Sequence, residues 1–374
     1  MKFRISIFIL LCLGCYKKND ASEAITIQDI QFKTTLKNHT PGVDYIVNKS
    51  LDVNKELIIE EGVEIRFEDA CGIYVVETGS IHINGSSSKP VRLKSKNESG
   101  KWNGIHISSS QDNQIHHAEI SGAGHLGNNH AAIEINALGQ LTIRNSQIKD
   151  NAQVSGILLT EQALCQLENC QLSGNLFPVQ MDLYAQLKQN NCDFSGNQHD
   201  MIRVFNRDGS ALYAGKALKI AQVGLPYFFT SSLLLNTSTV TIDAGTHILF
   251  ETGHGISTIS SMVNGLLLQV NGQAGKLVKF GSFHNGPNDL WRGFTLTSGQ
   301  HKIQYALFEK AYTGGKTLGT LSAYEYCNLD CKNSTFNADV DFCNISIFGK
   351  YVVYNSDINS RNTFKNSKLP CLIQ

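Results

Sequence analysis

The stretch "LTIRNSQIKDN" at residues 141–151 recurs as "CQLENCQLSGN" at 165–175 and as "LKQNNCDFSGN" at 187–197. Asparagine holds the same two places in each copy: Asn145, Asn169 and Asn191, followed by Asn151, Asn175 and Asn197. The copies thus follow one another at a nearly constant spacing. A repeat of about 20–25 residues is typical of a solenoid in which each copy forms one coil.

Alternating apolar residues identify the coil as β-structure. In "GVEIRF", charged residues separate Val63, Ile65 and Phe67, and "NGIHIS" and "AAIEIN" alternate in the same way. This period of two predicts strands that bury one face. Parallel coils stack about 4.8 Å apart and bring like residues together. Asparagine suits such a stack, because it tolerates a left-handed bend and can hydrogen-bond to the asparagine of the next coil.

The pattern continues near the C-terminus. Asn333, Phe336 and Asn337 are matched one repeat length later by Asn355, Ile358 and Asn359. We therefore expect "KNSTFN" and "YNSDIN" to form the same turn in neighbouring coils.

The sequence also contains a second, longer repeat. Residues 44–73 resemble 226–256, with Tyr45 matching Tyr227, and further on Trp102 matches Trp291. The repeat predicts an N-terminal cap at 25–43 and two copies of one β-helical block, at 44–215 and 216–374. Whether the copies form one rod or two rods side by side stays open.

Composition narrows the class of protein. The chain has 374 residues, 41% of them hydrophobic, and its 32 basic residues balance 32 acidic ones. It is therefore globular, and its neutrality disfavours a nucleic-acid partner held by bulk charge.

The first residues look like an export signal. Lys2 and Arg4 precede the short apolar run "ISIFILLCL", which ends at "LGC". The segment resembles a bacterial lipoprotein signal, which implies cleavage after residue 14, a lipid on Cys15, a tether at 15–24 and anchoring in the cell envelope, at the outer membrane. Cys12 and Leu13 depart from the usual pattern, so an ordinary secretory signal is the alternative.

The succession "LIIEEGVEIRFEDACGIYVVETGSIHINGSSSKPVRLKS" followed by "KWNGIHI" and "IHHAEI" resembles right-handed parallel β-helix repeat proteins. That superfamily includes pectate lyases and polygalacturonases, and the likeness covers nearly all of 44–374. It implies an all-β fold, but this architecture carries lyases, hydrolases, adhesins and spacers alike.

No catalytic residue is assigned. Polygalacturonases carry a Gly-His-Gly, as at 253–255 here, but His254 aligns with Cys71 of the first copy, and the family's other signatures are absent. Acidic pairs at 60–61, 68–69 and 339/341 could serve a lyase, yet none recurs on one face of neighbouring coils. We interpret them as solvated turn residues.

Four histidines lie close together in the sequence: His116, His117, His125 and His130. Imidazoles this close could bind Zn²⁺. Their spacing matches no zinc motif, and His117 aligns with Asn145 of the next repeat, so a variable surface loop is the favoured interpretation. We expect no cofactor.

A polar strand face is the third candidate site. The outward residues of equivalent strands are predicted to be His106, Glu134, Leu158, Gln180 and Arg203, with Trp102 beside them. An aromatic side chain near mixed polar groups on a long rod suits a sugar chain. The alternatives are ordinary surface polarity and a packing role for Trp102, which recurs as Trp291.

Eight cysteines remain after Cys12 and Cys15. Cys170 and Cys192 occupy one repeat position, above Ser146, and stacked coils would bring them within disulfide reach. We favour buried free thiols, because in-register stacking aims the side chains alike.

Three functions follow in order of preference. The first is a non-enzymatic, lipid-anchored envelope protein that presents a rigid face to a polysaccharide or a cell-surface protein. The second is a polysaccharide lyase or glycoside hydrolase, and the third is a structural spacer.

Overall fold

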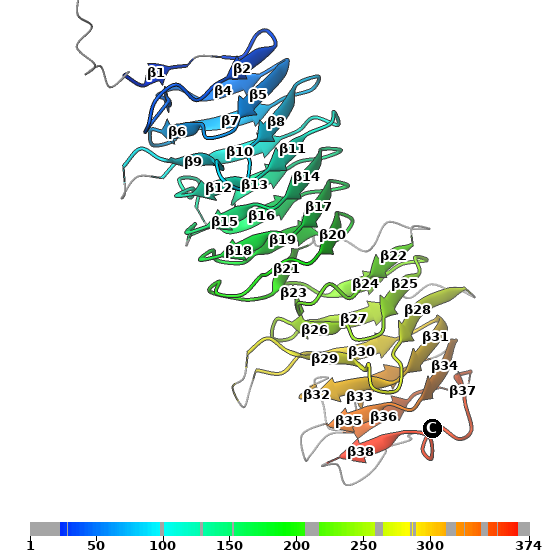
Figure 1. The fold of residues 1–374 in the computed structure, drawn as a ribbon. Helices are drawn as coiled ribbons and strands as arrows, with labels where there is room; N and C mark the ends of the chain where they lie inside the picture. Colours follow the sequence, from blue (N-terminus) through cyan, green and yellow to red (C-terminus); the bar gives the residue numbers. More distant parts are fainter. Residues whose placement is uncertain are drawn as a thin grey trace, which may run out of the picture.

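The computed structural model describes residues 23–365 except 28, 98–100, 128–129, 152, 206–216, 259–264, 285, 287–288, 312–318, 325, 338–342 and 350. Within these residues the chain forms strands and no helix, and every pair of named strands is parallel. Figure 1 shows the strands stacked coil upon coil from the blue end to the red end. The predicted all-β, parallel β-helical fold is confirmed.

Three sheets enclose the first half of the rod. Sheet 1 consists of β1 (Ile25–Thr26), β3 (Tyr45–Val47), β6 (Glu64–Phe67), β9 (Val91–Ser95), β12 (Ala118–Ser121), β15 (Gln147–Lys149) and β18 (Gln171–Ser173). Sheet 2 consists of β2 (Thr34–Leu36), β5 (Glu56–Glu60), β8 (Ser80–Asn84), β11 (Gln114–His116), β14 (Gln140–Arg144), β17 (Leu164–Glu168) and β20 (Gln186–Asn190).

The third sheet, here called the long sheet, runs through both halves. It consists of β4 (Leu51–Val53), β7 (Gly72–Val75), β10 (Gly104–Ile107), β13 (Ala131–Ile135), β16 (Ser155–Leu159), β19 (Val179–Asp182), β21 (Ile202–Phe205), β23 (Tyr227–Phe229), β26 (His247–Phe250), β29 (Val278–Ser282), β32 (Ala306–Glu309), β35 (Thr335–Asn337) and β38 (Thr363–Lys365).

Two further sheets complete the second half. Sheet 3 consists of β22 (Leu218–Ile220), β25 (Val240–Asp243), β28 (Leu266–Asn271), β31 (Gly299–Gln304), β34 (Cys327–Lys332) and β37 (Val353–Tyr354). Sheet 4 consists of β24 (Leu233–Leu235), β27 (Gly255–Thr258), β30 (Gly293–Leu296), β33 (Gly319–Ala323) and β36 (Cys343–Ile347).

Among the described strands, those of the long sheet alone pair across the junction between the two halves. Sheet 1 ends at β18 and sheet 2 at β20, whereas β21 pairs with β23 across the junction. The sequence repeat aligns β23 and β26 with β3 and β6 of sheet 1, yet both strands continue the long sheet. The second stack is consequently displaced sideways, as Figure 1 shows. The repeat could not decide this arrangement: the two stacks form one rod with a step.

The two asparagine rows have different physical roles. Asn145, Asn169 and Asn191 have φ between 51° and 52° and lie exposed at the bend between sheets 2 and 1. Their amides form a ladder, in which Asn191 Nδ2 donates to Asn169 Oδ1 at 2.8 Å. The second row is buried, with Asn151 Nδ2 donating to Asn175 Oδ1 at 3.0 Å. The left-handed bend predicted for both rows therefore holds only for the first.

The predicted match near the C-terminus is wrong. Thr335 pairs with Thr363 and Phe336 with Phe364, so the next coil places its strand at β38 rather than at "YNSDIN". The side chain of Asn355 instead accepts a hydrogen bond from the backbone of Cys331. The short asparagine spacing misled the alignment, because the final coil contains an additional turn at residues 356–360.

Apolar residues of every coil point inward and form one continuous core. In the first half the inward column of sheet 1 is aliphatic, as in Ile65, Leu93 and Ile120. In the second half aromatic rings stack along the long sheet, with Phe308 and Phe336 centred 4.7 Å apart. Stacking of like side chains on successive coils supplies the stability of the rod.

Among the residues that the structure describes, there is no helix of the length and hydropathy needed to cross a bilayer.

Candidate functional site

The predicted ligand row does lie along one sheet. On the long sheet His106 pairs with Glu134, and the row continues through Leu158, Gln180 and Arg203. However, His106 is only 8% exposed, Glu134 6% and Gln180 4%. The expectation of an open face is therefore wrong for this row. Residues that precede the strands pack onto it, as the contacts of His130 and Phe177 show.

Trp102 lies inside the rod rather than beside a ligand. Its side chain is fully buried, stacks on Phe67 at 4.2 Å and donates from Nε1 to the carbonyl of Ser121 at 2.8 Å. Trp291 repeats this arrangement against Phe250 in the second half. The packing alternative is the one that the structure shows.

Glu134 is held between two histidines. His106 Nδ1 lies 3.1 Å from Oε2 and His130 Nδ1 lies 2.7 Å from Oε1. Burial alone would raise the pKa of Glu134, but the hydrogen bonds and charges of both histidines lower it below its usual value. The carboxylate is consequently ionised at neutral pH.

His106 is locked on both sides. Its ring stacks on Tyr74 with centroids 4.5 Å apart, and its Nε2 lies 3.0 Å from the carbonyl oxygen of Asn103. Both ring nitrogens face acceptors, so both hydrogen bonds form together only when each nitrogen carries a proton. His130, by contrast, is 40% exposed at its side chain and can present its second nitrogen to solvent.

An aromatic cluster covers the end of the row near the junction. The guanidinium of Arg203 lies 5.9 Å from the ring centre of Phe177 and donates to Gln180 Oε1 at 3.2 Å. Phe177 also stacks on His199, and Phe228 stacks on Phe283 at 4.0 Å. Arg203 and Gln180 are thus engaged with each other and with neighbouring rings.

The four predicted metal ligands do not come together. His116 lies on β11 beside Arg144, and its pKa is lowered by burial and by that positive charge. His117 occupies the bend above Asn145, with φ of 48°. His125 is exposed, and His130 binds Glu134. Among the described residues no group of three or more His, Cys, Asp or Glu is arranged to hold a metal ion.

His254 is part of the scaffold. Its carbonyl accepts from Arg292 N, as that of Cys71 accepts from Asn103 N in the first half. The next residue, Gly255, donates to Ser232 Oγ. The same contact between neighbouring coils thus occurs in both halves. Two other predicted features, the acidic pair at 339/341 and Cys15, lie outside the residues that the structure describes.

The outer face of sheet 2 is open and polar. Pairing of β14, β17 and β20 places Thr142, Gln166 and Lys188 in one row. Arg144, Glu168 and Asn190 form a second row beside it. These side chains are exposed or half-buried, in contrast to the row on the long sheet.

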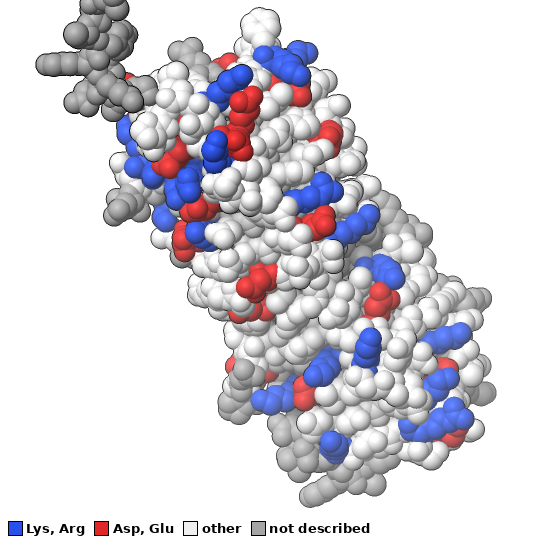
Figure 2. All heavy atoms as spheres, viewed as in Figure 1, with Lys and Arg blue, Asp and Glu red and all other residues white. Residues whose placement is uncertain are grey.

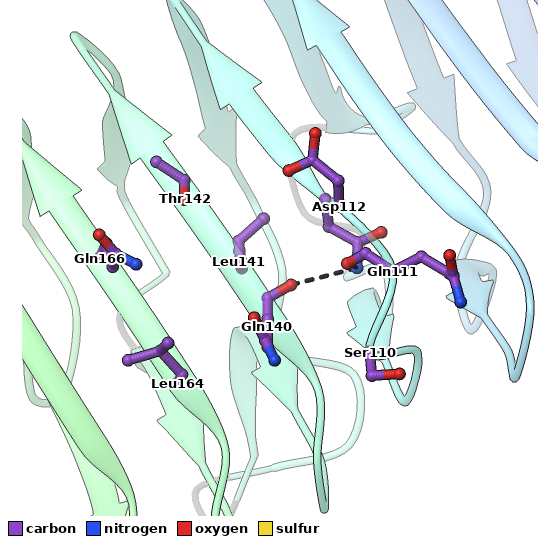
Figure 3. Close-up of a pocket in the computed structure, with 9 residues that line it drawn as sticks. Ser110, Gln111, Asp112, Gln140, Leu141, Thr142, Leu164 and Gln166 are labelled. Carbon is purple, nitrogen blue, oxygen red and sulfur yellow. Dashed lines mark hydrogen bonds between the residues drawn. The ribbon is translucent and has the colours of Figure 1, made fainter.

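Two shallow hollows lie on this face. One, of about 290 Å³, is lined by polar residues of the loop at 110–113 together with Gln140, Thr142 and Gln166. Figure 3 shows these side chains on the loop and on the neighbouring strands that line the hollow. The other, of about 230 Å³, lies between Arg144, Glu168 and Lys188. Sequence reasoning missed these rows, although polar residues that recur at the coil spacing between apolar neighbours were a usable signal.

The outer face of sheet 1 carries mutually paired charges. Glu119 lies 2.8 Å from Lys94 Nζ and 3.3 Å from Lys149 Nζ. Burial would raise the pKa of Glu119, but the two lysines lower it. Figure 2 shows basic and acidic side chains interspersed on the visible face, without a large patch of one sign.

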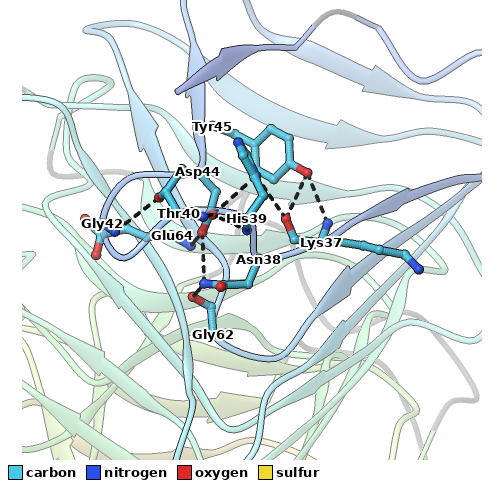
Figure 4. A network of polar contacts seen from close by, with 9 residues as sticks. All are labelled: Lys37, Asn38, His39, Thr40, Gly42, Asp44, Tyr45, Gly62 and Glu64. Atoms are coloured by element: carbon cyan, nitrogen blue, oxygen red, sulfur yellow. Dashed lines mark hydrogen bonds and ion pairs between the residues drawn. The ribbon is translucent and has the colours of Figure 1, made fainter. Parts of the chain in front are cut away.

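A further polar cluster closes the N-terminal end. The buried carboxylate of Asp44 accepts hydrogen bonds from the backbone of His39, Thr40 and Glu64 at 2.8–2.9 Å. Figure 4 shows these donors converging on Asp44, with Tyr45 reaching back to Lys37. Because backbone donors occupy both carboxylate oxygens, the cluster ties the 25–43 segment to the first coil.

A family model described as "Right handed beta helix region" matches the chain twice, over residues 54–209 and 131–285. No curated protein matches, and no solved structure matches. The two matches together span more than half of the chain and agree with its parallel coils. The chain therefore belongs to the family of right-handed β-helix proteins.

Proposed function

We propose that this protein is a non-enzymatic binding protein that holds a polysaccharide on the outer face of sheet 2. The observation that carries the proposal is the pair of polar hollows across β14, β17 and β20, lined by amide, hydroxyl and charged side chains. Such groups exchange hydrogen bonds with sugar hydroxyls. The rows repeat every coil, about 4.8 Å, which is close to the length of one sugar ring in an extended chain.

The binding test uses the chain from residue 25 and a panel of neutral and acidic polysaccharides in affinity electrophoresis. Each hydrogen bond exchanged with water contributes about 0.5–1.5 kcal/mol, so Gln166→Ala should weaken retention about two- to tenfold. The matched control is Gln171→Ala, because Gln171 is also exposed and lies in the same coil but on sheet 1. Equal effects of the two changes, or no retention by any polysaccharide, would contradict the proposal and favour the spacer.

One observation favours a second candidate, an acid–base enzyme acting on a polysaccharide. Glu134 binds Nδ1 of His130, which orients the exposed imidazole so that Nε2 could accept a proton. Loss of a general base typically costs 10²–10⁴ in rate. Release of new reducing ends or unsaturated products by the wild type, abolished by His130→Ala, would establish the enzyme and overturn our first choice.

We also propose that the protein is exported and anchored to the cell envelope by lipid on Cys15. The basic residues at 2 and 4, the apolar run and the "LGC" ending support this. Mass spectrometry of the mature chain from the membrane fraction should find lipid on an N-terminal Cys15. A mature chain that starts elsewhere, with Cys15 removed or unmodified, would refute the anchor.

A further inference from the structure

Two cysteines on neighbouring coils face each other at the bend between sheets 2 and 1. Cys170 follows Asn169 and Cys192 follows Asn191 in the exposed asparagine ladder. Asp193 N donates to the carbonyl of Cys170 at 2.8 Å, so the two backbones are in register. In the reduced chain each thiol donates to a backbone carbonyl two residues earlier, Cys170 Sγ to Glu168 O at 3.3 Å and Cys192 Sγ to Asn190 O at 3.4 Å.

The pair is open to solvent on one side. Cys170 is buried and Cys192 is half-buried. A hollow of about 490 Å³, lined by Cys170 with Asn169, Gln171 and neighbouring polar residues, lies over the bend. Because Cys192 is itself half-buried, a small reagent can reach its thiol, whereas Cys165 and Cys331 are fully enclosed in the core.

The two thiols are not equivalent. The nearby thiol of Cys170 lowers the pKa of Cys192, although burial and the charge of Glu168 oppose this. The nearby Cys192, together with burial, raises the pKa of Cys170. Burial likewise raises the pKa of Cys71, Cys165, Cys327 and Cys331. Cys192 is therefore the more acidic and the more exposed of the two thiols, and the thiolate is the nucleophilic form of cysteine.

We propose that Cys170 and Cys192 form a redox-active dithiol that exchanges with small-molecule disulfides and closes into a disulfide between adjacent coils. The spacing permits the bond, because stacked strands lie about 4.8 Å apart and disulfides need Cα atoms about 4.4–6.8 Å apart.

The exchange has two steps. The Cys192 thiolate attacks a disulfide R–S–S–R′, forms the mixed disulfide Cys192–S–S–R and expels R′S⁻. Cys170 then loses its proton and attacks the Cys192 sulfur, which forms the Cys170–Cys192 bond and expels RS⁻. Two protein thiols are oxidised, and the small disulfide is reduced to two thiols.

The position of the pair gives the bond a structural consequence. In the part of the chain that the structure describes, sheet 1 ends at β18, followed by the bridge from Gln171 to Asp193, and sheet 2 ends at β20. The disulfide would join the last coil of the first stack to the coil before it, where pairing on two of the three sides stops.

The experiment treats the reduced, folded full chain with oxidised glutathione and follows each cysteine by peptide mapping. We expect a transient glutathione adduct on Cys192, then loss of two hydrogen atoms in mass and a Cys170–Cys192 cross-link. In Cys170→Ser the adduct on Cys192 should persist, and in Cys192→Ser residue 170 should stay unreacted. Serine is tolerated sterically, because Ser146 holds the equivalent position and bonds to the Arg144 carbonyl; circular dichroism checks folding.

Alkylation with iodoacetamide at neutral pH gives a second readout that needs no variant. A thiol with a lower pKa has a larger fraction of thiolate, but each thiolate is a weaker nucleophile. Together these effects predict that Cys192 reacts about tenfold faster than Cys71 in the same molecule. Equal alkylation rates would overturn the assignment of Cys192 as the reactive thiol. A glutathione adduct that persists in the wild-type chain, or a cross-link to another cysteine, would overturn the dithiol.

Discussion

Replacing Asn175 by alanine tests whether the buried asparagine row stabilises the rod more than the exposed row. Asn175 is 1% exposed. Its Nδ2 donates to the Ile148 carbonyl and to Asn197 Oδ1, and its Oδ1 accepts from Asn151 Nδ2. Alanine removes three hydrogen bonds and leaves a buried carbonyl and a buried amide without these partners. Each orphaned group costs about 1–3 kcal/mol, so we expect a loss of about 3–5 kcal/mol in the free energy of unfolding.

The comparison is Asn169 in the exposed row, whose two ladder bonds compete with water. Asn169→Ala should cost about 1–2 kcal/mol, part of it from the left-handed backbone, and Asn169→Gly should recover that part. Urea denaturation measures the free energy of unfolding of the variants in both rows. Hydrogen exchange across residues 140–200 serves as a local probe, because solenoids can unfold in segments. The reasoning fails if Asn175→Ala costs no more than Asn169→Ala.

Two further predictions concern stability. The folded-state pKa of Glu134 is lowered, so its ionised form stabilises the fold above the unfolded pKa, and this stability is lost as pH falls through the folded pKa. Glu134→Gln should therefore be less stable at neutral pH and lose less stability on acidification; parallel pH profiles for the two proteins would disprove this. Trp102→Ala should cost about 3–5 kcal/mol, because it empties a site stacked on Phe67, with Trp291 fluorescence reporting unfolding. A cost below about 1 kcal/mol would be inconsistent with core packing.

Much of the candidate site depended on contacts that no sequence pattern carries. The alternation placed His106, Glu134 and Gln180 in one outward row, and the pairing agrees. Whether that row is open depends on the residues before each strand, and His130 and Phe177 fold onto it. A side chain that points outward from a strand is therefore not necessarily exposed, because irregular segments that flank the strands can cover it.

The fold itself was determined by the sequence, because period-two alternation and a regular asparagine repeat impose stacked parallel coils wherever they occur together. The internal duplication was likewise readable, and Trp102 and Trp291 pack alike in the two halves. Only the tertiary structure decided that the halves share one long sheet with a sideways step. It also decided that Trp102 faces the core and that Cys170 is buried whereas Cys192 is half-buried. The physical reason is that local patterns specify which face of a strand is apolar. Which strands pair at a junction, and which residues cover the outer face of a sheet, depend on segments that are distant in the chain.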